Sequence, residues 1–291
     1  MKQMTRRDFL KLTRLVGLNT FLVGMGGLGY STLVEPGWLE VVRVRLKLPR
    51  LAPSFAGFRL VQISDIHIGD WMNRERLQHV VRRALAQEPD LIVITGDFVI
   101  GRVWNASIKA SVDDLVEALS ALTKRHTALA VLGNHDYWTN VQAVRAALRD
   151  CGIHNLSNDV YTLSKDGAQL HIAGVDDIWE DHDDLKLVLE KLPPSGAAIL
   201  LAHEPDFADR SAGTGRFDLQ LSGHTHGGQV VLPWIGAPLL PHLGKKYPAG
   251  LYRVGDMWQY TNRGVGMARL KVRLNCRPEI TVFTLEPGTA S

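Results

Sequence analysis

The sequence of 291 residues predicts an α/β fold in which a two-sheet β-sandwich is flanked by helices. In the first half, strand-like apolar runs alternate with helical periods, a pattern typical of right-handed crossovers and parallel strands. The second half holds more strand-like runs and one clear helix. An apolar content of 45% suffices for one large core. We therefore expect a short N-terminal segment, residues 1–34, followed by a single domain at residues 35–291.

The N-terminal segment has the layout of a targeting sequence. Residues 5–11, TRRDFLK, resemble the twin-arginine export motif, and a glycine-rich apolar stretch follows at residues 15–34. Arg14, Asn19 and the glycines between Gly24 and Gly29 make this stretch a poor transmembrane span. No convincing small-x-small cleavage site is present. The segment is therefore expected to be either a signal or an anchor that stays attached without cleavage. An amphipathic helix that packs on the domain is the alternative.

The basic residues are concentrated at the N-terminus. The net charge of the chain is +3, but the first 34 residues carry five basic residues against one acidic residue. The remaining 28 basic and 29 acidic residues nearly cancel. A neutral body lacks the basic surface that binds polyanions, so no nucleic-acid partner is expected.

The first half predicts strands separated by amphipathic helices. Residues 39–48 alternate apolar and basic side chains, which favours an edge strand with one solvated face. Residues 73–87 place apolar side chains on one helical face, and Pro89 ends that helix. The same reasoning predicts strands at 59–64, 91–95 and 128–132, and helices at 111–122 and 139–149.

The second half predicts a further set of strands. Short apolar runs bounded by turn residues indicate strands at 160–163, 170–175, 198–201, 217–221 and 228–232, and a C-terminal pair near Leu251 and Ile280. A helix is predicted at 183–192. The two cysteines, Cys151 and Cys276, are predicted to be free thiols, although an oxidising compartment would allow them to pair.

Polar residues with metal-ligand chemistry follow most of the predicted strands. Loops at the carboxyl ends of parallel strands are where α/β folds place ligands. The i, i+2 spacing of the first and last pairs predicts side chains that point to one side of an extended segment. The residues are Asp65 and His67, Asp97 after Gly96, Asn134 and His135 after Gly133, His203, and His224 and His226 after Gly223.

With these motifs in order, the chain resembles the calcineurin-like metallophosphoesterase family, and most closely its exported bacterial phosphodiesterases. The resemblance covers residues 58–285. Within this range it includes the Gly-Gly-Gln run at 227–229 and the segments 263–266 and 278–280. It implies the four-layer fold of that family. It also implies two divalent or transition metal ions, with Mn, Fe, Zn, Ni and Co as candidates for imidazole and oxygen ligands.

Carried over residue by residue, the resemblance implies two ligand sets and a shared carboxylate. The first set is Asp65, His67 and His226; the second is Asn134, His203 and His224; Asp97 bridges them. A shared carboxylate suits two cations about 3.5–4 Å apart. The implied reaction is in-line attack of a metal-bridging hydroxide on phosphorus.

Two further residues are assigned catalytic roles by the resemblance. His135 is expected to stabilise the transition state or to protonate the leaving oxygen. Asp136 is expected either to orient the His135 ring or to cap the helix predicted to begin near Thr139. Asp176 and Asp177 are expected in a loop near the rim of the site.

Departures from the family pattern favour a phosphate diester as substrate. Phosphoprotein phosphatases of this superfamily have an arginine after the Gly-Asp motif and a glutamate after Asn-His, whereas this chain has Phe98 and Asp136 there. A phosphodiesterase is therefore expected. A phosphomonoesterase and a non-catalytic metal-binding scaffold are the alternatives, and degeneration to a scaffold would normally remove ligands that this chain retains.

An apolar stretch with four prolines at residues 230–252 follows the last histidine motif. Long loops without periodicity are often functional. If this loop is exposed, it could receive an acyl chain or contact a membrane; otherwise it covers the core. Candidate substrates include small diesters and lipid-linked diesters such as a UDP-diacylglucosamine-like pyrophosphate. The export machinery is the expected partner, and the periplasm or the outer face of the inner membrane is the expected location.

Overall fold

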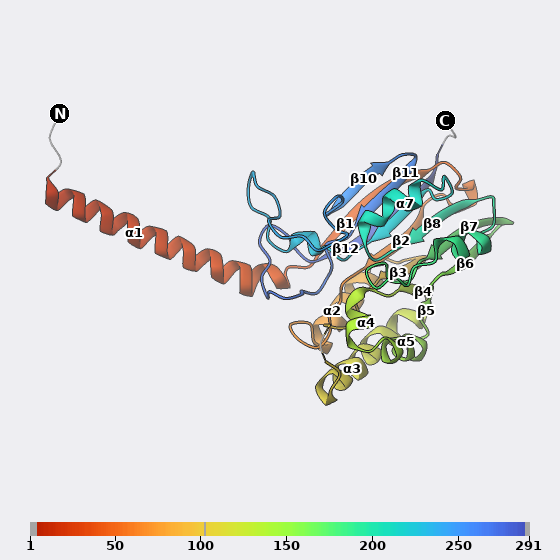
Figure 1. The fold of residues 1–291 in the computed structure, drawn as a ribbon, viewed down its shortest axis with the longest axis horizontal. Coiled ribbons are helices and arrows are strands. Elements are labelled where there is room, and N and C mark those ends of the chain that lie inside the picture. The colour runs from red at the N-terminus through yellow and green to blue at the C-terminus, as the bar shows by residue number, and fades with distance from the viewer. Residues whose placement is uncertain (1–4, 102, 289–291) are drawn as a thin grey trace.

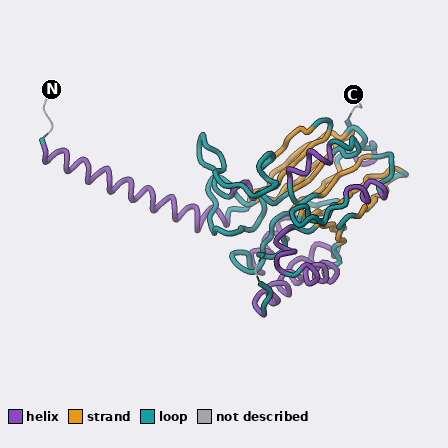
Figure 2. The backbone as a smooth tube through the Cα atoms, in the orientation of Figure 1, coloured by secondary structure: helices purple, strands orange, loops and turns teal. Residues whose placement is uncertain are grey.

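Two six-stranded sheets form the body of the protein, as seen in a computed structural model that describes residues 5–101 and 103–288 (Figure 1). The first sheet has the order β1-β12-β2-β3-β4-β5. The second has the order β10-β11-β9-β8-β7-β6. Helices cover the outer face of each sheet, so the four-layer α/β architecture that the sequence predicted is confirmed (Figure 2).

The first sheet is built mainly from the alternating units of the first half. Its parallel strands β2, β3, β4 and β5 are joined by helices, and β12 inserts antiparallel to β2. As predicted, β1 lies at an edge. The bounds are β1 Glu40–Leu48, β2 Phe58–Ile63, α2 Arg74–Leu85, β3 Leu91–Thr95, α3 Ala106–Thr123, β4 Thr127–Val131, α4 Asn134–Thr139, α5 Val141–Asp150, β5 His154–Asn155 and β12 Glu279–Pro287.

The second sheet is built from the second half of the chain. Strands β7, β8, β9 and β11 run parallel, and the edge strands β6 and β10 are antiparallel to their neighbours. The bounds are β6 Asp159–Lys165, β7 Ala168–Gly174, α6 Leu185–Lys191, β8 Ala197–Leu201, α7 Ala208–Ala212, β9 Leu219–Ser222, β10 Gly250–Val254 and β11 Met257–Thr261.

Apolar side chains of both sheets fill the space between them. Leu60 and Phe283 of the first sheet belong to the same buried cluster as Ile199 and Leu221 of the second. Such strands are buried on both faces, which explains their nearly continuous apolar runs. The packing fixes the ends of the parallel strands of both sheets at one edge of the sandwich.

Two expectations about the second half were wrong. Residues 228–232 form no strand, because the chain passes through a one-turn helix at His226–Gly228 and makes only isolated bridges, from Val230 to Leu274 and from Leu232 to Gly236. The C-terminal strands are not a pair, since β10 and β12 lie in different sheets. The intervening strand β11 was missed. The helix α3 also begins five residues before the predicted position 111, at Ala106.

The N-terminal segment forms the helix α1, Arg6–Gly29, which projects away from the body (Figure 1). One π-helical turn and one 3₁₀ turn, Tyr30–Val34 and Glu35–Gly37, connect it to β1. None of the helices in the described part of the chain combines the length and apolar character needed to cross a membrane. Cys151 and Cys276 are both buried and unpaired.

Candidate metal centre

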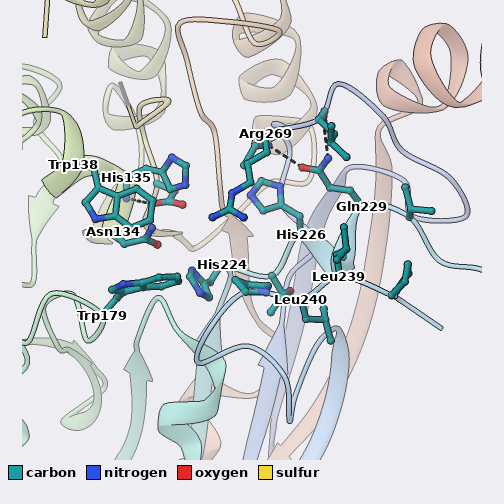
Figure 3. A pocket seen from close by; sticks show the side chains of 18 residues that line it. Asn134, His135, Trp138, Trp179, His224, His226, Gln229, Leu239, Leu240 and Arg269 are labelled. Atoms are coloured by element: carbon teal, nitrogen blue, oxygen red, sulfur yellow. Dashed lines mark hydrogen bonds between the residues drawn. The ribbon is translucent and has the colours of Figure 1, made fainter. Parts of the chain in front are cut away.

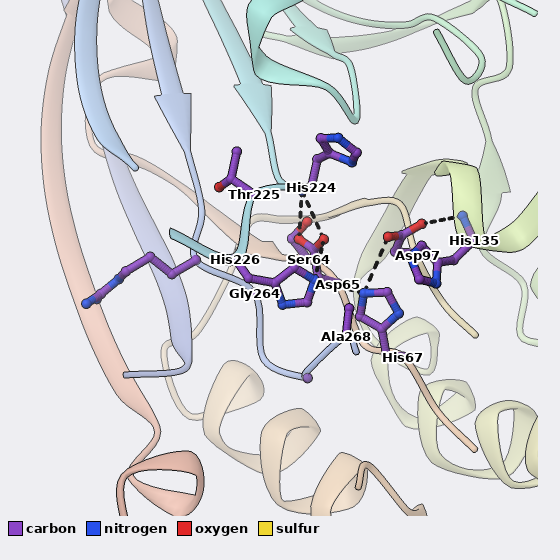
Figure 4. A network of polar contacts seen from close by, with 12 residues as sticks. Ser64, Asp65, His67, Asp97, His135, His224, Thr225, His226, Gly264 and Ala268 are labelled. Atoms are coloured by element: carbon purple, nitrogen blue, oxygen red, sulfur yellow. Dashed lines mark hydrogen bonds and ion pairs between the residues drawn. The ribbon is translucent and has the colours of Figure 1, made fainter. Parts of the chain in front are cut away.

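The strand-end motifs of both sheets converge at one edge of the sandwich (Figure 4). Asp65, Asp97 and Asn134 follow β2, β3 and β4 of the first sheet. His203 and His224 follow β8 and β9 of the second sheet. Residues widely separated in the sequence therefore share one site, because the parallel strands of each sheet end at the same edge.

A first group of four ligand atoms forms around Asp65. The ligand atoms of Asp65, His67, Asp97 and His226 all lie within 4.8 Å of one another, and all four residues are buried. The Nε2 atoms of His67 and His226 are 2.9 Å apart. His226 Nε2 also lies 3.4 Å from Asp65 Oδ1. Mutually facing nitrogen and carboxylate lone pairs are the arrangement a cation would stabilise.

A second group lies beside the first and shares Asp97 with it. The ligand atoms of His203, Glu204 and His224 lie within 4.8 Å of one another. Asp97 Oδ2 is 3.4 Å from His67 Nε2 and 3.2 Å from His203 Nε2. A single carboxylate oxygen therefore stands between the two groups, the position of a bridging ligand.

Asn134 was predicted as a ligand from the sequence, whereas Glu204 was not. The Oδ1 atom of Asn134 is buried and has no hydrogen-bond partner among the described residues. Since a buried polar atom without a partner is costly, this amide oxygen is available to a cation. Glu204 was missed by the sequence reasoning, although it directly follows His203 in the chain.

Hydrogen bonds outside the two groups set which imidazole nitrogen faces the site. His203 Nδ1 lies 2.6 Å from the carbonyl oxygen of Thr95, which leaves Nε2 toward Asp97. His224 Nε2 lies 2.8 Å from the carbonyl oxygen of His242, which leaves Nδ1 for the second group. Such partners fix the tautomer and the ring orientation of a ligating histidine.

The electrostatics of the site match a cation. Burial lowers the pKa of His67 to about 3 and that of His224 to about 4, so both rings are neutral, which is the ligating form. Burial raises the pKa of Asp65 to about 7. Burial would also lower the pKa of His203, yet the carboxylates of Asp97 and Glu204 raise it well above its ordinary value. The neutral rings of His67 and His224 are therefore in the ligating form, and a cation at the second group would take the place of the proton that the carboxylates hold on His203.

Glycines allow the backbone to approach the ligands. A Cβ atom at Gly133 would lie 2.7 Å from His203 Nε2 and closer still to the carboxylate of Asp97. A Cβ atom at Gly96 would lie 2.9 Å from the backbone nitrogen of Gly133. Both contacts are too short for a Cβ atom, so a side chain at either position would push Asp97, His203 or the backbone beside them away.

The expected extended geometry of the i, i+2 pairs is wrong. Asp65, His67, Asp97, His224 and His226 have φ between +49° and +71°, in the left-handed region. Non-glycine residues rarely adopt this conformation, and it concentrates at functional sites where the surroundings impose it. Each chain segment turns sharply after its strand and so directs its ligands inward.

His135 lies beside the ligand groups without joining them. Its ring centroid is 4.6 Å from that of His67, and its Nδ1 accepts a hydrogen bond from the backbone N–H of Gly101 at 2.9 Å. In a neutral ring, an accepting Nδ1 places the proton on Nε2. His135 also lines the pocket over the site, so that proton is available to a ligand there.

Asp136 does not orient the His135 ring. Its carboxylate accepts hydrogen bonds from the backbone N–H groups of Asp97, Phe98, Val99 and Gly133 at 2.8–3.2 Å. The orienting role is therefore contradicted. The capping alternative is the one these contacts support, although the helix that Asp136 caps is α4, which begins at Asn134 rather than near Thr139.

Asp177 lies in a loop that reaches the cavity through Trp179, as predicted, but its own side chain does not face the solvent. It is fully buried, and burial, followed by the neighbouring charge of Glu204, raises its pKa to about 10. A protonated Asp177 can donate to the Glu204 carboxylate. The pairing of Asp177 with Glu204 could not be predicted from the sequence, because the two residues follow different strands, β7 and β8.

A cavity of about 240 Å³ opens over the two ligand groups (Figure 3). Its walls combine the polar residues His135 and His224 with Trp138 and Trp179. Arg269 enters from the segment after β11 and lines the same cavity. Arg269 was not predicted from the sequence, because only the position directly after Asp97 was expected to carry a phosphate-binding arginine.

Comparison with known proteins identifies the family. The model of the calcineurin-like phosphoesterases matches residues 58–228. The metallophosphoesterase YkuE of Bacillus subtilis (strain 168) is 37% identical and covers 98% of this chain and 99% of its own. The phosphodiesterase YaeI of Escherichia coli (strain K12) is 32% identical and covers 97% and 99%. A transmembrane protein with a metallophosphoesterase domain from Bos taurus is 34% identical and covers 84% of this chain and 57% of its own.

The fold and the paired ligand groups define a metal-dependent phosphoesterase. This chain belongs to the calcineurin-like phosphoesterase family. The cofactors are accordingly two divalent metal ions, of unspecified identity.

Proposed function

We propose that this protein is a phosphodiesterase that uses both ligand groups in one reaction. The observation that carries the proposal is the position of Asp97, whose Oδ2 atom lies within 3.4 Å of a ligand nitrogen in each group. One carboxylate shared in this way holds two ions close enough to act on the same phosphate.

The bound ions would lower the pKa of a shared water and neutralise charge on the phosphoryl oxygens. The protein supplies the remaining steps. Asp97 and Asn134 line the cavity, so a phosphate bound there would contact the ligand groups. His135 lines the same cavity and carries a proton on Nε2. Transfer of that proton to the departing oxygen is general acid catalysis.

Several features favour a diester over a monoester. The two residues directly after Asp97, Phe98 and Val99, are buried and apolar, so neither offers a cation to a terminal phosphate. The relative from Escherichia coli is named a phosphodiesterase. Arg269 lines the cavity, where it can bind one phosphoryl oxygen while the apolar residues around it accommodate a second substituent.

Apolar residues favour a substrate with an apolar part. Leu239, Leu240 and Leu270 line the cavity together with the histidines of the site (Figure 3). A lipid-linked diester, for which a UDP-diacylglucosamine-like pyrophosphate is one model, would place its acyl portion against these leucines.

We also propose export by the twin-arginine route, to the periplasm or to the outer face of the inner membrane. The support is the motif at residues 5–11. Cell fractionation of the natural chain and of an Arg6→Lys/Arg7→Lys variant tests this proposal. We expect the variant to remain in the cytoplasm, and equal export of both chains would refute the proposal.

The deciding experiment compares bis-p-nitrophenyl phosphate with p-nitrophenyl phosphate as substrates. Metal-stripped protein is supplied in turn with Mn, Zn, Fe, Ni or Co. We expect metal-restored cleavage of the diester in preference to the monoester. A preference for the monoester would identify a phosphomonoesterase, and metal binding without any turnover would favour the scaffold.

A further inference from the structure

Exposed apolar side chains gather beside the mouth of the cavity. Trp234 is fully exposed, and Ile235 and Leu239 are 72% and 71% exposed. These three residues belong to the loop between the turn at His226–Gly228 and β10, and Leu270, in the segment after β11, is 58% exposed. Exposed apolar groups that cluster in this way mark an interaction surface.

Backbone hydrogen bonds join the apolar loop to the segment after β11. The backbone N–H of Val231 donates to the carbonyl of Leu274 at 2.8 Å, and the N–H of Leu274 donates to the carbonyl of Gln229 at 2.9 Å. The Gln229 side chain donates to the carbonyl of Leu270 at 2.7 Å and accepts from the N–H of Ala268 at 2.8 Å (Figure 3). The two segments therefore form one connected surface.

The two turns that follow α1, Tyr30–Val34 and Glu35–Gly37, are attached to the same surface. The buried carboxylate of Glu35 accepts hydrogen bonds from the backbone N–H groups of Asn275 at 3.0 Å and Cys276 at 2.6 Å. The N–H of Arg273 donates to the carbonyl of Ser31 at 2.9 Å. The segment at residues 30–37 thus lies on the side of the molecule that carries the apolar loop (Figure 1), and Leu33 within it is exposed.

The unpaired charge of this surface is basic. Residues 230–244 contain no acidic residue, and residues 263–278 contain five basic residues and no acidic residue. Arg263 and Lys271 of this group are paired with acidic residues of other segments, and Arg273 is fully buried. Arg269, which lines the cavity, and Arg277, which lies over the Trp38 ring, supply the remaining charge. The projecting α1 adds four exposed cations, Arg6, Arg7, Lys11 and Arg14. Two copies of such a surface would repel each other, whereas anionic lipid headgroups complement it.

We propose that this surface docks on an anionic phospholipid bilayer. Trp234 and Ile235 enter the headgroup region, where tryptophan and apolar side chains gain most from contact with lipid, and the basic residues face the headgroups. The mouth of the cavity then lies at the bilayer surface. A corollary, which rests on the proposed function, is that an amphipathic diester reaches the metal centre from the bilayer along Leu239 and Leu270.

A fluorescent label separates docking of this loop from binding by α1 alone. Cys151 and Cys276 are 2% and 1% exposed, so a thiol-reactive, environment-sensitive dye labels a cysteine introduced in the full-length chain by Trp234→Cys. The matched control is Leu187→Cys in α6, at an exposed leucine on the outer face of the second sheet. The probes are phosphatidylcholine vesicles with and without phosphatidylglycerol.

We expect the dye at position 234 to shift to shorter wavelength with anionic vesicles, and the dye at position 187 to stay unchanged. Vesicle binding without a shift at position 234 would show that α1 binds alone, and would overturn the proposal. A shift that needs no vesicles and grows with protein concentration would show that a second copy covers the surface, which also overturns it.

A second measurement tests the corollary. The double variant Trp234→Ser/Ile235→Ser should hydrolyse soluble bis-p-nitrophenyl phosphate at the rate of the unaltered protein. Its hydrolysis of hexadecyl p-nitrophenyl phosphate embedded in anionic vesicles should fall about tenfold, because weaker binding to the bilayer lowers access to the embedded diester. Equal rates on the embedded diester would refute the corollary. Failure of the unaltered protein to cleave the soluble diester would count against the proposed function and leave the docking result intact.

Discussion

At the scale of single residues, the position of Asp97 determines how the two ligand groups are coupled. Its Oδ2 atom faces a histidine of each sheet, and its Oδ1 atom accepts a hydrogen bond from the backbone N–H of His135 at 3.0 Å. The carboxylate therefore has contacts with both ligand groups and with the proposed acid. His135 is held by the same carboxylate through its backbone, while its ring remains outside the ligand groups.

Replacement of the shared carboxylate should affect both metals. We expect Asp97→Ala to lower the content of both ions and to abolish diester hydrolysis, because each ion loses a charged ligand. Elemental analysis and turnover of bis-p-nitrophenyl phosphate measure the two effects. Retention of two ions per chain in this variant would contradict the bridging assignment.

The His135 ring should affect the reaction without affecting the metals. We expect His135→Ala to keep both ions and to lose about 2–4 kcal/mol of transition-state stabilisation, the range for one general acid or charge-stabilising donor. Measurement of kcat alongside the metal content tests this expectation. His79→Ala, at an exposed histidine of α2, is the matched control and should keep full activity. Loss of metal in the His135 variant would identify it as a ligand.

At the scale of elements, the loops after β7 and β8 meet through a buried pair of carboxyl groups. Asp177 follows β7 and Glu204 follows β8, and both are fully buried. The Asp177 carboxyl group also accepts from the backbone N–H of Glu180 at 2.9 Å, and the Glu204 carboxylate accepts from the N–H of Ile178 at 3.3 Å. The pair thus connects the ends of β7 and β8 and links Asp177 to the second ligand group through Glu204.

This pair should make stability depend on pH. Burial and Glu204 raise the pKa of Asp177 to about 10 from the ordinary value of 3.8, so the folded state holds a proton that the unfolded chain loses between these values. The free energy of unfolding should therefore fall as pH rises through this window, by up to about 1.4 kcal/mol per pH unit.

The substitution Asp177→Asn tests this dependence, because an amide keeps a donor toward Glu204 and has no proton to lose. We expect denaturant melts between pH 5 and pH 9 to show a shallower decline for this variant than for the unaltered chain. Asp166→Asn, in an exposed turn, is the control and should leave the slope unchanged. Equal slopes for the unaltered chain and the Asp177 variant would show that Asp177 is charged in the folded state.

At the scale of the whole molecule, the metal centre joins the two sheets. Asp65, His67, Asp97 and Asn134 follow strands of the first sheet, whereas the three ligand histidines of the second sheet follow β8 and β9. The hydrophobic layer between the sheets brings the strand ends together, and the ions hold those ends in place. Metal binding and stability of the sandwich are therefore linked.

Removal of the ions should lower the melting temperature. A ligand present at a thousandfold excess over its Kd stabilises the folded state by about 4 kcal/mol, which corresponds to a shift on the order of 10 °C. We expect a chelator to produce a decrease of this size in a thermal melt, and added metal to reverse it. The Asp97→Ala variant should show little response to the chelator. An unchanged melting temperature after verified removal of the ions would contradict the link between the sheets.

The sequence alone predicted most strands and helices and the order of the strand-end motifs, because apolar periodicity and strand-end position are properties of contiguous residues. Only the tertiary structure decided the left-handed backbone of the ligand residues, the partners of Asp136, and the placement of Glu204 beside Asp177. The same holds for Arg269 in the cavity wall, and for the pairing of Val231 with Leu274 where a strand was expected. These features depend on contacts between segments far apart in the chain, and local patterns in a sequence do not record which distant backbone groups become neighbours after the sheets pack.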